Sequence, residues 1–145
     1  MNVQSIIGAK GADVATVKQQ ATLADAAAQL RDRGVGALVV SDDDEHIDGI
    51  VSERDVVRAL ASHGAGALGR TVASVMTSDV VTCEVSDSVE QLMMSMTERR
   101  IRHIPVVDAE RRISGIVSIG DIVKARLGAL ETENKALFEY ITTGR

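Results

Sequence analysis

The sequence of 145 residues is poor in the residue types that build several common kinds of site. Its one cysteine, Cys83, excludes an internal disulfide and argues against a cysteine-based zinc site. One phenylalanine, one tyrosine and no tryptophan leave too few rings for the stacking platforms that bind single-stranded nucleic acid. A net charge of −5 also argues against non-specific binding to duplex nucleic acid. We therefore expect no nucleic-acid partner.

Long apolar runs are missing from the sequence as well. No stretch approaches the roughly 20 apolar residues that a membrane helix needs. The segment Met1–Lys10 lacks the basic start and long apolar run of a signal peptide. We therefore expect a cytoplasmic protein that does not bind a membrane. Hydrophobic residues still make up 45% of the chain, so the core must be aliphatic.

The sequence contains an internal repeat. When it is shifted by 66 positions, residues 13–60 align with residues 79–126 without a gap, and 14 of the 48 pairs are identical. A period of this length indicates two copies of one supersecondary unit that pack together and share a core. We expect ligand sites to occur in pseudo-equivalent pairs where the two copies meet.

The hydrophobic pattern predicts the same element order in each copy: strand, helix, strand, turn, strand, helix. In the first copy, Thr22 is expected to begin a helix, with Asp25 as its capping partner and Gly34 as the residue that ends it. In the second copy, Ser86 or Asp87 is expected to begin the equivalent helix. The predicted fold class is mixed α/β, of the α+β type, with the copies packed as a pseudo-two-fold pair.

The repeat divides the chain into four segments. Repeat 1 spans residues 5–63, a glycine-rich linker spans 64–71, repeat 2 spans 72–126, and a C-terminal helix and tail span 127–145. The glycine content of the linker predicts a flexible segment.

The C-terminal segment has a helical pattern of its own. Its apolar and polar core positions recur at steps of three and four residues: Leu127, Leu130, Asn134, Leu137 and Ile141. Two interpretations stay open, a helix packed on its own domain and a self-association helix with Asn134 as a polar register residue.

The motif Gly-Ile-Val-Ser-x-x-Asp occurs at residues 49–55 and again at 115–121. It predicts a buried strand that leads directly into a helix N-terminus, where backbone N–H groups and the helix dipole favour an anion or a polar ligand edge. A single Ser-x-x-Asp is typical of a capping box, because the side chains of these two residue types satisfy free backbone groups. The aspartate can also accept two hydroxyl hydrogen bonds from a ribose.

A basic motif occurs only in the second copy. It runs Arg99-Arg100-Ile101-Arg102-His103-Ile104-Pro105, where a helix is expected to turn into a buried strand. Arg54 lies in the first copy, and its equivalent in the second is Gly120. Two interpretations stay open: the arginine cluster forms a solvated basic face, or Arg102 and His103, with Arg54 from the other side, contact a phosphate near the seam between the copies.

These motifs together resemble a tandem pair of cystathionine β-synthase (CBS) domains, also called a Bateman module. The resemblance rests on Met76-Thr77, Val80-Val81-Thr82, Arg102-His103-Ile104-Pro105-Val106 and the two Gly-Ile-Val-Ser-x-x-Asp segments, and it covers about residues 5–126. It implies two β-α-β-β-α units joined through their sheets, with adenosyl ligands in clefts between them. The first copy lacks the His-x-Pro signature, so occupation of one or of both clefts stays open.

The resemblance also implies roles for individual residues. Asp55 and Asp121 would bind ribose hydroxyls. Five residues would lie near phosphate: Ser52, Ser118, Arg54, Arg102 and His103. The strand residues Ile104 and Pro105 are also expected among the binding residues. Thr16 and Thr82, with their neighbours Val17 and Cys83, would line the adenine pockets through backbone groups. Each threonine would serve the cleft closed by the aspartate of the other repeat.

The leading functional hypothesis is a regulatory, non-catalytic module that senses energy state by binding AMP, ADP, ATP or NAD(H). It would need no cofactor or metal, form a homodimer and act on an unknown downstream protein. An enzyme is disfavoured because the sequence has no Ser-His-Asp set, P-loop or Gly-x-Gly-x-x-Gly motif, and its three histidines are dispersed. The alternative is a structural, dimerising adaptor that does not sense nucleotides.

Overall fold

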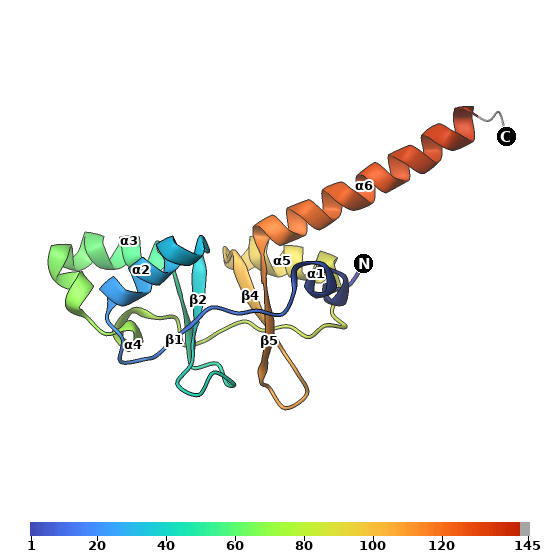
Figure 1. Cartoon of the computed structure of the whole chain (residues 1–145). Coiled ribbons are helices and arrows are strands. Elements are labelled where there is room, and N and C mark those ends of the chain that lie inside the picture. Colours follow the sequence, from blue (N-terminus) through green and yellow to red (C-terminus); the bar gives the residue numbers. More distant parts are fainter. Residues whose placement is uncertain (143–145) are drawn as a thin grey trace.

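The structure is a computed structural model that describes residues 1–142, so the last three residues of the predicted tail lie outside the described residues. Its elements follow in the order α1 (Val3–Lys10), β1 (Thr16–Val17), α2 (Leu23–Arg33), β2 (Ala37–Val40), β3 (Gly49–Ser52), α3 (Glu53–His63), the 3-10 helix η1 (Gly64–Gly69), α4 (Val72–Val75), α5 (Val89–Arg99), β4 (His103–Val107), β5 (Ile113–Ser118) and α6 (Ile119–Thr142). Figure 1 shows the two repeats side by side, with α6 extending away from them. The mixed α/β fold predicted from the repeat is confirmed.

Each repeat is built on a small sheet. In repeat 1, β1 pairs with β2 in parallel and β2 pairs with β3 in antiparallel. In repeat 2, β4 and β5 form an antiparallel pair, and the equivalent of β1 is reduced to one parallel bridge between Cys83 and Val106. The backbone N–H of Cys83 donates to the carbonyl of Pro105 at 3.0 Å, and Val107 N–H donates to Cys83 O at 2.9 Å. The extended segment around Cys83 is therefore held to the sheet at a single residue.

Helix starts follow the capping chemistry of the sequence. Thr22 caps α2 in a capping box with Asp25, and Gly34 ends the helix with a left-handed backbone (φ 63°), as predicted. For α5 the predicted start at Ser86 or Asp87 is wrong. The helix is capped by Ser88, whose side chain accepts from Gln91 N while the side chain of Gln91 accepts from Ser88 N.

The two hydrophobic cores are completed by helices that cross between repeats. In α4, at the start of repeat 2, Val72 is fully buried in the core of repeat 1. In α1, at the start of repeat 1, Val3 is fully buried in the core of repeat 2. The backbone holds the helices in equivalent ways: Val72 N–H donates to Ala21 O at 2.8 Å, and Val3 N–H donates to Asp87 O at 2.9 Å. The repeats are thus interlocked rather than merely adjacent.

The glycine-rich linker has regular secondary structure, and the prediction that it is flexible is wrong. Residues 64–69 form the 3-10 helix η1, and Ala67 is fully buried in the core of repeat 1. Gly64 has a φ of 64°, a left-handed conformation that favours glycine and lets the chain leave α3. Gly64 therefore serves to turn the chain out of α3.

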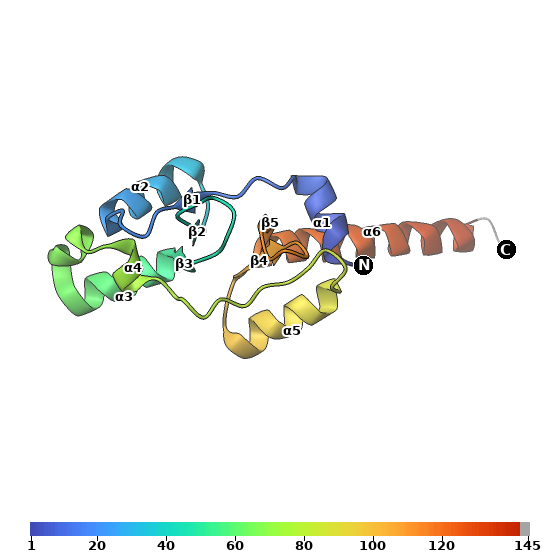
Figure 2. The same cartoon turned by 90° about the horizontal axis from the view of Figure 1, so that it is seen from below.

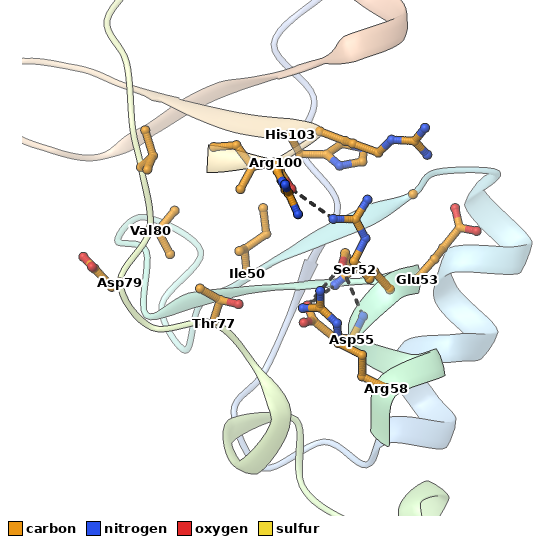
Figure 3. Close-up of a pocket in the computed structure, with 15 residues that line it drawn as sticks. Ile50, Ser52, Glu53, Asp55, Arg58, Thr77, Asp79, Val80, Arg100 and His103 are labelled. Carbon is orange, nitrogen blue, oxygen red and sulfur yellow. Dashed lines mark hydrogen bonds between the residues drawn. The ribbon is translucent and has the colours of Figure 1, made fainter. Parts of the chain in front are cut away.

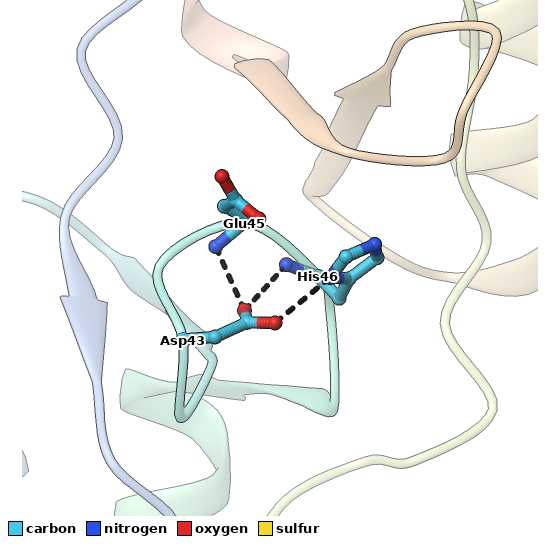
Figure 4. A group of neighbouring side chains, drawn as sticks. All are labelled: Asp43, Glu45 and His46. Atoms are coloured by element: carbon cyan, nitrogen blue, oxygen red, sulfur yellow. Dashed lines mark hydrogen bonds and ion pairs between the residues drawn. The ribbon is translucent and has the colours of Figure 1, made fainter.

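The loop between β2 and β3 reaches the second repeat. Asp43 organises it, because one carboxylate oxygen accepts from Glu45 N–H at 2.8 Å and His46 N–H at 2.7 Å, while the other lies 2.8 Å from His46 Nδ1 (Figure 4). Side-chain ligand atoms of Asp43, Glu45 and His46 lie within 4.8 Å of one another. The hydrogen bonds of Asp43 explain why these three side chains lie together: they hold the loop in shape. From this loop, Glu45 O accepts from Ile113 N–H at the edge of β5.

The last helix, α6, is continuous over 24 residues. It begins after Ser118, as predicted, and buries Ile122 in the core of repeat 2. Figure 2 shows its C-terminal half running away from the body. None of the helices in residues 1–142 has the length and apolarity needed to cross a bilayer.

Two equivalent glycines, Gly49 and Gly115, allow close contact with other segments. We expect their substitution by alanine to destabilise the protein to different extents. A Cβ added at Gly49 would lie 2.6 Å from Met76 Sδ and 2.9 Å from the backbone oxygen of Thr77. One added at Gly115 would lie 2.7 Å from Ile7 Cδ1, the mobile end of a side chain. We expect Gly49→Ala to lower the free energy of unfolding by about 1–3 kcal/mol and Gly115→Ala to lower it by less.

Urea denaturation of the variants measures this difference. Gly8→Ala is the matched control, because Gly8 is an exposed position in α1 with open space around it. It should raise the free energy of unfolding by about 0.5–1 kcal/mol. Equal stability of the Gly49→Ala and Gly115→Ala proteins would contradict the prediction.

Candidate ligand-binding site

A cleft of about 230 Å³ lies between the two repeats (Figure 3). Repeat 1 contributes the end of β3 and the first turns of α3, and repeat 2 contributes the end of α5 and the start of β4. The chain that follows α4 forms a third wall. The residues that give the cleft its chemistry are Ser52, Glu53, Arg54, Asp55, Arg58, Thr77, Asp79, Val80, Val81, Arg100, Arg102 and His103.

The start of α3 carries the carboxylate of the cleft. Asp55 Oδ2 accepts from Ser52 N–H at 2.8 Å and from Ser52 Oγ at 3.1 Å, and Ser52 Oγ accepts from Asp55 N–H at 3.3 Å. The capping box is therefore real. It uses one carboxylate oxygen, and within residues 1–142 Asp55 Oδ1 takes no hydrogen bond. A second oxygen thus remains available to a ligand at a helix N-terminus.

Arginines dominate the charge of the cleft. Four arginines line it against three carboxylates: Arg54, Arg58, Arg100 and Arg102 against Glu53, Asp55 and Asp79. Arg54 Nη1 donates to Arg100 O at 3.0 Å, which links α3 of repeat 1 to the end of α5 in repeat 2. Guanidinium groups bind phosphate oxygens with paired, charge-assisted hydrogen bonds. The charge and the donor geometry therefore suit a phosphorylated ligand that touches both repeats.

His103 begins β4 and packs against repeat 1. A Cβ at Gly36 would lie 3.0 Å from His103 Cε1 and 3.1 Å from Glu53 Oε1, so glycine at this position permits the approach. Burial lowers the pKa of His103 from its ordinary value. We therefore expect a neutral imidazole at pH 7.

The charges around His103 come from several elements. Lys10 in α1 and Arg102 lower its pKa, whereas Asp121 in α6 and Glu53 in α3 raise it. Added negative charge in the cleft would favour the protonated ring. His103 is thus placed to respond to an anionic ligand.

The motif at residues 115–121 is in a different environment. Asp121 Oδ2 accepts from Ser118 N–H at 2.9 Å and from Lys10 Nζ at 2.7 Å, and Lys10 Nζ also donates to Ile116 O at 2.9 Å. Burial would raise the pKa of Asp121, but the hydrogen bonds and charge of Lys10, with the Ser118 bonds, hold it below its ordinary value. An ammonium group of the chain itself therefore occupies one carboxylate oxygen of this motif.

The remaining predicted binding residues lie elsewhere. Thr16 Oγ1 donates to Asp44 Oδ1 at 2.8 Å, and Thr16 and Val17 line a separate depression beside α2. Thr82 directly follows the cleft wall formed by residues 79–81 but is not part of the lining. Three others are buried in the core or sheet of repeat 2: Cys83, Ile104 and Pro105.

Cys83 is a packing residue in this arrangement. Burial, with smaller contributions from Asp87 and Glu84, raises the pKa of its thiol to about 12. The thiolate needed for redox chemistry is therefore scarce at neutral pH. The side chain is 5% exposed and belongs to the core of repeat 2.

Sequence reasoning missed several cleft residues. Arg58 lies one turn after Arg54 and shares its helix face, so helical spacing was a usable signal. Arg100 is the C-cap of α5 and has a left-handed backbone (φ 54°), a conformation that is uncommon for arginine. Thr77 pairs with Ile50 through backbone hydrogen bonds of 2.9 Å in both directions, and no side-chain pattern reports such a contact.

Comparison with known proteins gives the family. Residues 10–62 and 72–128 match the family described as CBS domain. The mitochondrial CBS domain-containing protein CBSX3 of Arabidopsis thaliana is 35% identical over 127 residues, which is 85% of this chain and 61% of that protein. The chain therefore spans less than two thirds of this relative.

Solved structures agree with this match. The CBS-domain containing protein ATU1752 from Agrobacterium tumefaciens superposes with a TM-score of 0.82 at 43% identity, over 86% of this chain and 98% of that one. The Pyrobaculum aerophilum protein PAE2072, complexed with AMP, has a TM-score of 0.73 at 25% identity, over 83% and 89%. The CBS domain pair of protein MJ0100, in complex with 5′-methylthioadenosine and S-adenosyl-L-methionine, has a TM-score of 0.79 at 26% identity, over 89% and 98%.

The resemblance carried by the paired motifs is thereby confirmed. Both halves of the sequence repeat match the same family, and the structure packs them as a pair with a cleft between them. The chain belongs to the CBS-domain family, as a tandem pair of CBS domains.

Proposed function

We propose that this CBS pair is a regulatory, non-catalytic module that binds an adenine nucleotide in the cleft beside Asp55. The observation that carries the proposal is the pairing, in one cleft, of a capped helix carboxylate with four arginines from both repeats. Relatives crystallised with AMP, 5′-methylthioadenosine and S-adenosyl-L-methionine support it, since these ligands share an adenosine group.

Each part of the cleft suits one part of the ligand. Asp55 Oδ1 accepts the ribose hydroxyls, because Oδ2 is already used by the cap. The arginines and the N-terminus of α3 bind the phosphates. The apolar side chains of Ile50, Val80 and Val81 line the remaining wall and provide a surface for the adenine ring.

AMP, ADP, ATP and NAD(H) are all candidates for this site, and none is required as a resident cofactor. The ligand would signal by bridging the repeats, because Arg54 and Arg58 belong to one repeat and Arg100 and Arg102 to the other. A nucleotide that binds one inter-repeat arrangement more tightly shifts the population towards it. That arrangement is then the form that a downstream protein reads.

The proposed role of Asp55 in binding the ribose gives the first prediction for the cleft. Asp55→Asn should weaken nucleotide binding by about 1.5–3 kcal/mol, because a charged hydrogen-bond acceptor is lost. Isothermal titration with AMP, ATP and NADH measures the change, and adenosine serves as the phosphate-free ligand. Tighter binding of the phosphorylated ligands than of adenosine is expected.

Asp25→Asn is the matched control for this experiment. Asp25 caps α2 in the same kind of box, with Asp25 Oδ2 accepting from Thr22 N–H at 3.2 Å, but it lies outside the Asp55 cleft. Both variants should lose similar stability, and only Asp55→Asn should lose affinity. Equal affinities in the two variants would count against the ribose role, and no binding to any of these ligands would favour the structural adaptor.

The second prediction concerns pH. Because the pKa of His103 is lowered in the free protein, its contribution to stability is complete above the unfolded pKa of about 6.5 and declines as pH falls below it. Bound phosphate should raise this pKa, so binding takes up a proton and affinity rises as pH falls towards 6. Titrations of the native and His103→Gln proteins at several pH values isolate the effect, since protonation of the phosphate is common to both. Parallel pH profiles would rule it out.

The third prediction concerns the motif occupied by Lys10. Because the Asp121 carboxylate already forms an ion pair with Lys10, and glycines stand at the positions equivalent to three of the four cleft arginines, we expect the native chain to bind one nucleotide. Lys10→Met removes the ammonium but keeps an apolar side chain, and should allow a second, weaker binding event at Asp121. Lys135→Met, which removes an exposed charge on α6, should leave the stoichiometry at one. Two nucleotides on the native chain, or one on Lys10→Met, would contradict this assignment.

A further inference from the structure

The last helix leaves the body of the protein. Every residue from Leu130 to Thr142 is exposed, and Figures 1 and 2 both show this half of α6 projecting from the two repeats. A short helix without tertiary packing is marginal in water, because most helix stability in proteins comes from the packing of an apolar face. We therefore expect the apolar face of this half of α6 to be covered by a surface that is not among residues 1–142.

The exposed face follows a heptad repeat. Six positions at alternating steps of four and three residues form what we call the α6 seam: Val123, Leu127, Leu130, Asn134, Leu137 and Ile141. Its five apolar side chains are 46–66% exposed. In heptad letters, Leu127, Asn134 and Ile141 are a positions and the other three are d positions. This is the pattern of a coiled-coil seam.

We propose that a second copy of this chain covers the α6 seam, so that two α6 helices form a parallel, in-register coiled coil. Asn134 favours this occupant over an unrelated apolar helix. In a parallel pair each a position faces the same position of the partner helix, so the two Asn134 amides meet and hydrogen-bond to each other. An apolar partner would leave this amide buried without a hydrogen bond.

The charges beside the seam match the same arrangement. Arg126 is a g position and Glu131 is an e position, five residues apart. In a parallel pair, g of one helix faces this e of the other, so two Arg126–Glu131 pairs form by symmetry. Arg126 Nη1 also donates to Glu90 in its own chain at 3.2 Å, and the other guanidinium donors remain for the second copy. An antiparallel pair would face g with g and lose this match.

The inference does not rest on nucleotide binding. The seam residues from Leu127 onward lie outside the Asp55 cleft. Failure of the nucleotide titrations would therefore leave it standing, and absence of dimers would leave the proposed nucleotide site standing.

Sedimentation velocity of the full chain over a micromolar concentration series tests the proposal. The native protein should be a dimer, and Leu137→Glu should weaken dimerisation by more than about tenfold, because it places a charge in the seam. Ala136→Glu is the matched control: it adds the same charge at the neighbouring exposed position, off the seam, and should remain dimeric. Circular dichroism should show that both variants keep the folded body.

A cysteine at the end of the seam tests the orientation. Ile141→Cys should form a disulfide between two copies under oxidation, because identical a positions meet only in a parallel, in-register pair. The native Cys83 is buried, so it serves as an internal negative control in the unsubstituted protein. A monomeric native protein, a dimer that survives Leu137→Glu, or a failure of Ile141→Cys to cross-link would each overturn the proposal.

Discussion

The exchange of the helices α1 and α4 determines how this protein is assembled. Val72 from α4 completes the core of repeat 1, and Val3 from α1 completes the core of repeat 2. A unit of about 60 residues buries a smaller share of its surface than a larger domain and is marginally stable, so the helix at the start of each repeat adds needed packing to the core of the other. Separating the repeats would expose both cores, and we infer that they fold as a coupled pair.

This interlocking also forms the walls of the Asp55 cleft. The chain that leaves α4 passes Gly49 so closely that Thr77 pairs with Ile50, and the same segment then forms one wall of the Asp55 cleft. The cleft therefore has walls from both repeats and from the segment that ties them together. Under the proposed function, a ligand held there would contact both repeats, which is the geometry that a population-shift mechanism needs.

Much of this arrangement could be predicted from the sequence, because it depends on local chemistry repeated twice. The element order follows from the internal repeat. The residue 66 positions after Thr22 is Ser88, the true cap of α5, whereas the predicted start of this helix is Ser86 or Asp87. The contact of Lys10 with Asp121 could not be predicted, because it joins residues 111 positions apart through the exchange of α1. The packing of η1 was missed for a similar reason, since glycine content reports backbone freedom and not the buried position of Ala67.

The two Gly-Ile-Val-Ser-x-x-Asp motifs have diverged, and the one at residues 115–121 takes part in a structural contact. The four cleft arginines have these equivalents 66 positions away in the other repeat: Arg54 with Gly120, Arg58 with Lys124, Arg100 with Gly34 and Arg102 with Gly36. The Asp121 motif thus retains a single cation among the equivalent positions and gains Lys10 directly on its carboxylate. Because Lys10 ends α1, the helix that completes the core of repeat 2, the ion pair ties that helix to α6. Under the proposed function, Asp55 meets the ligand, while Asp121 secures the exchange of helices on which the cleft depends.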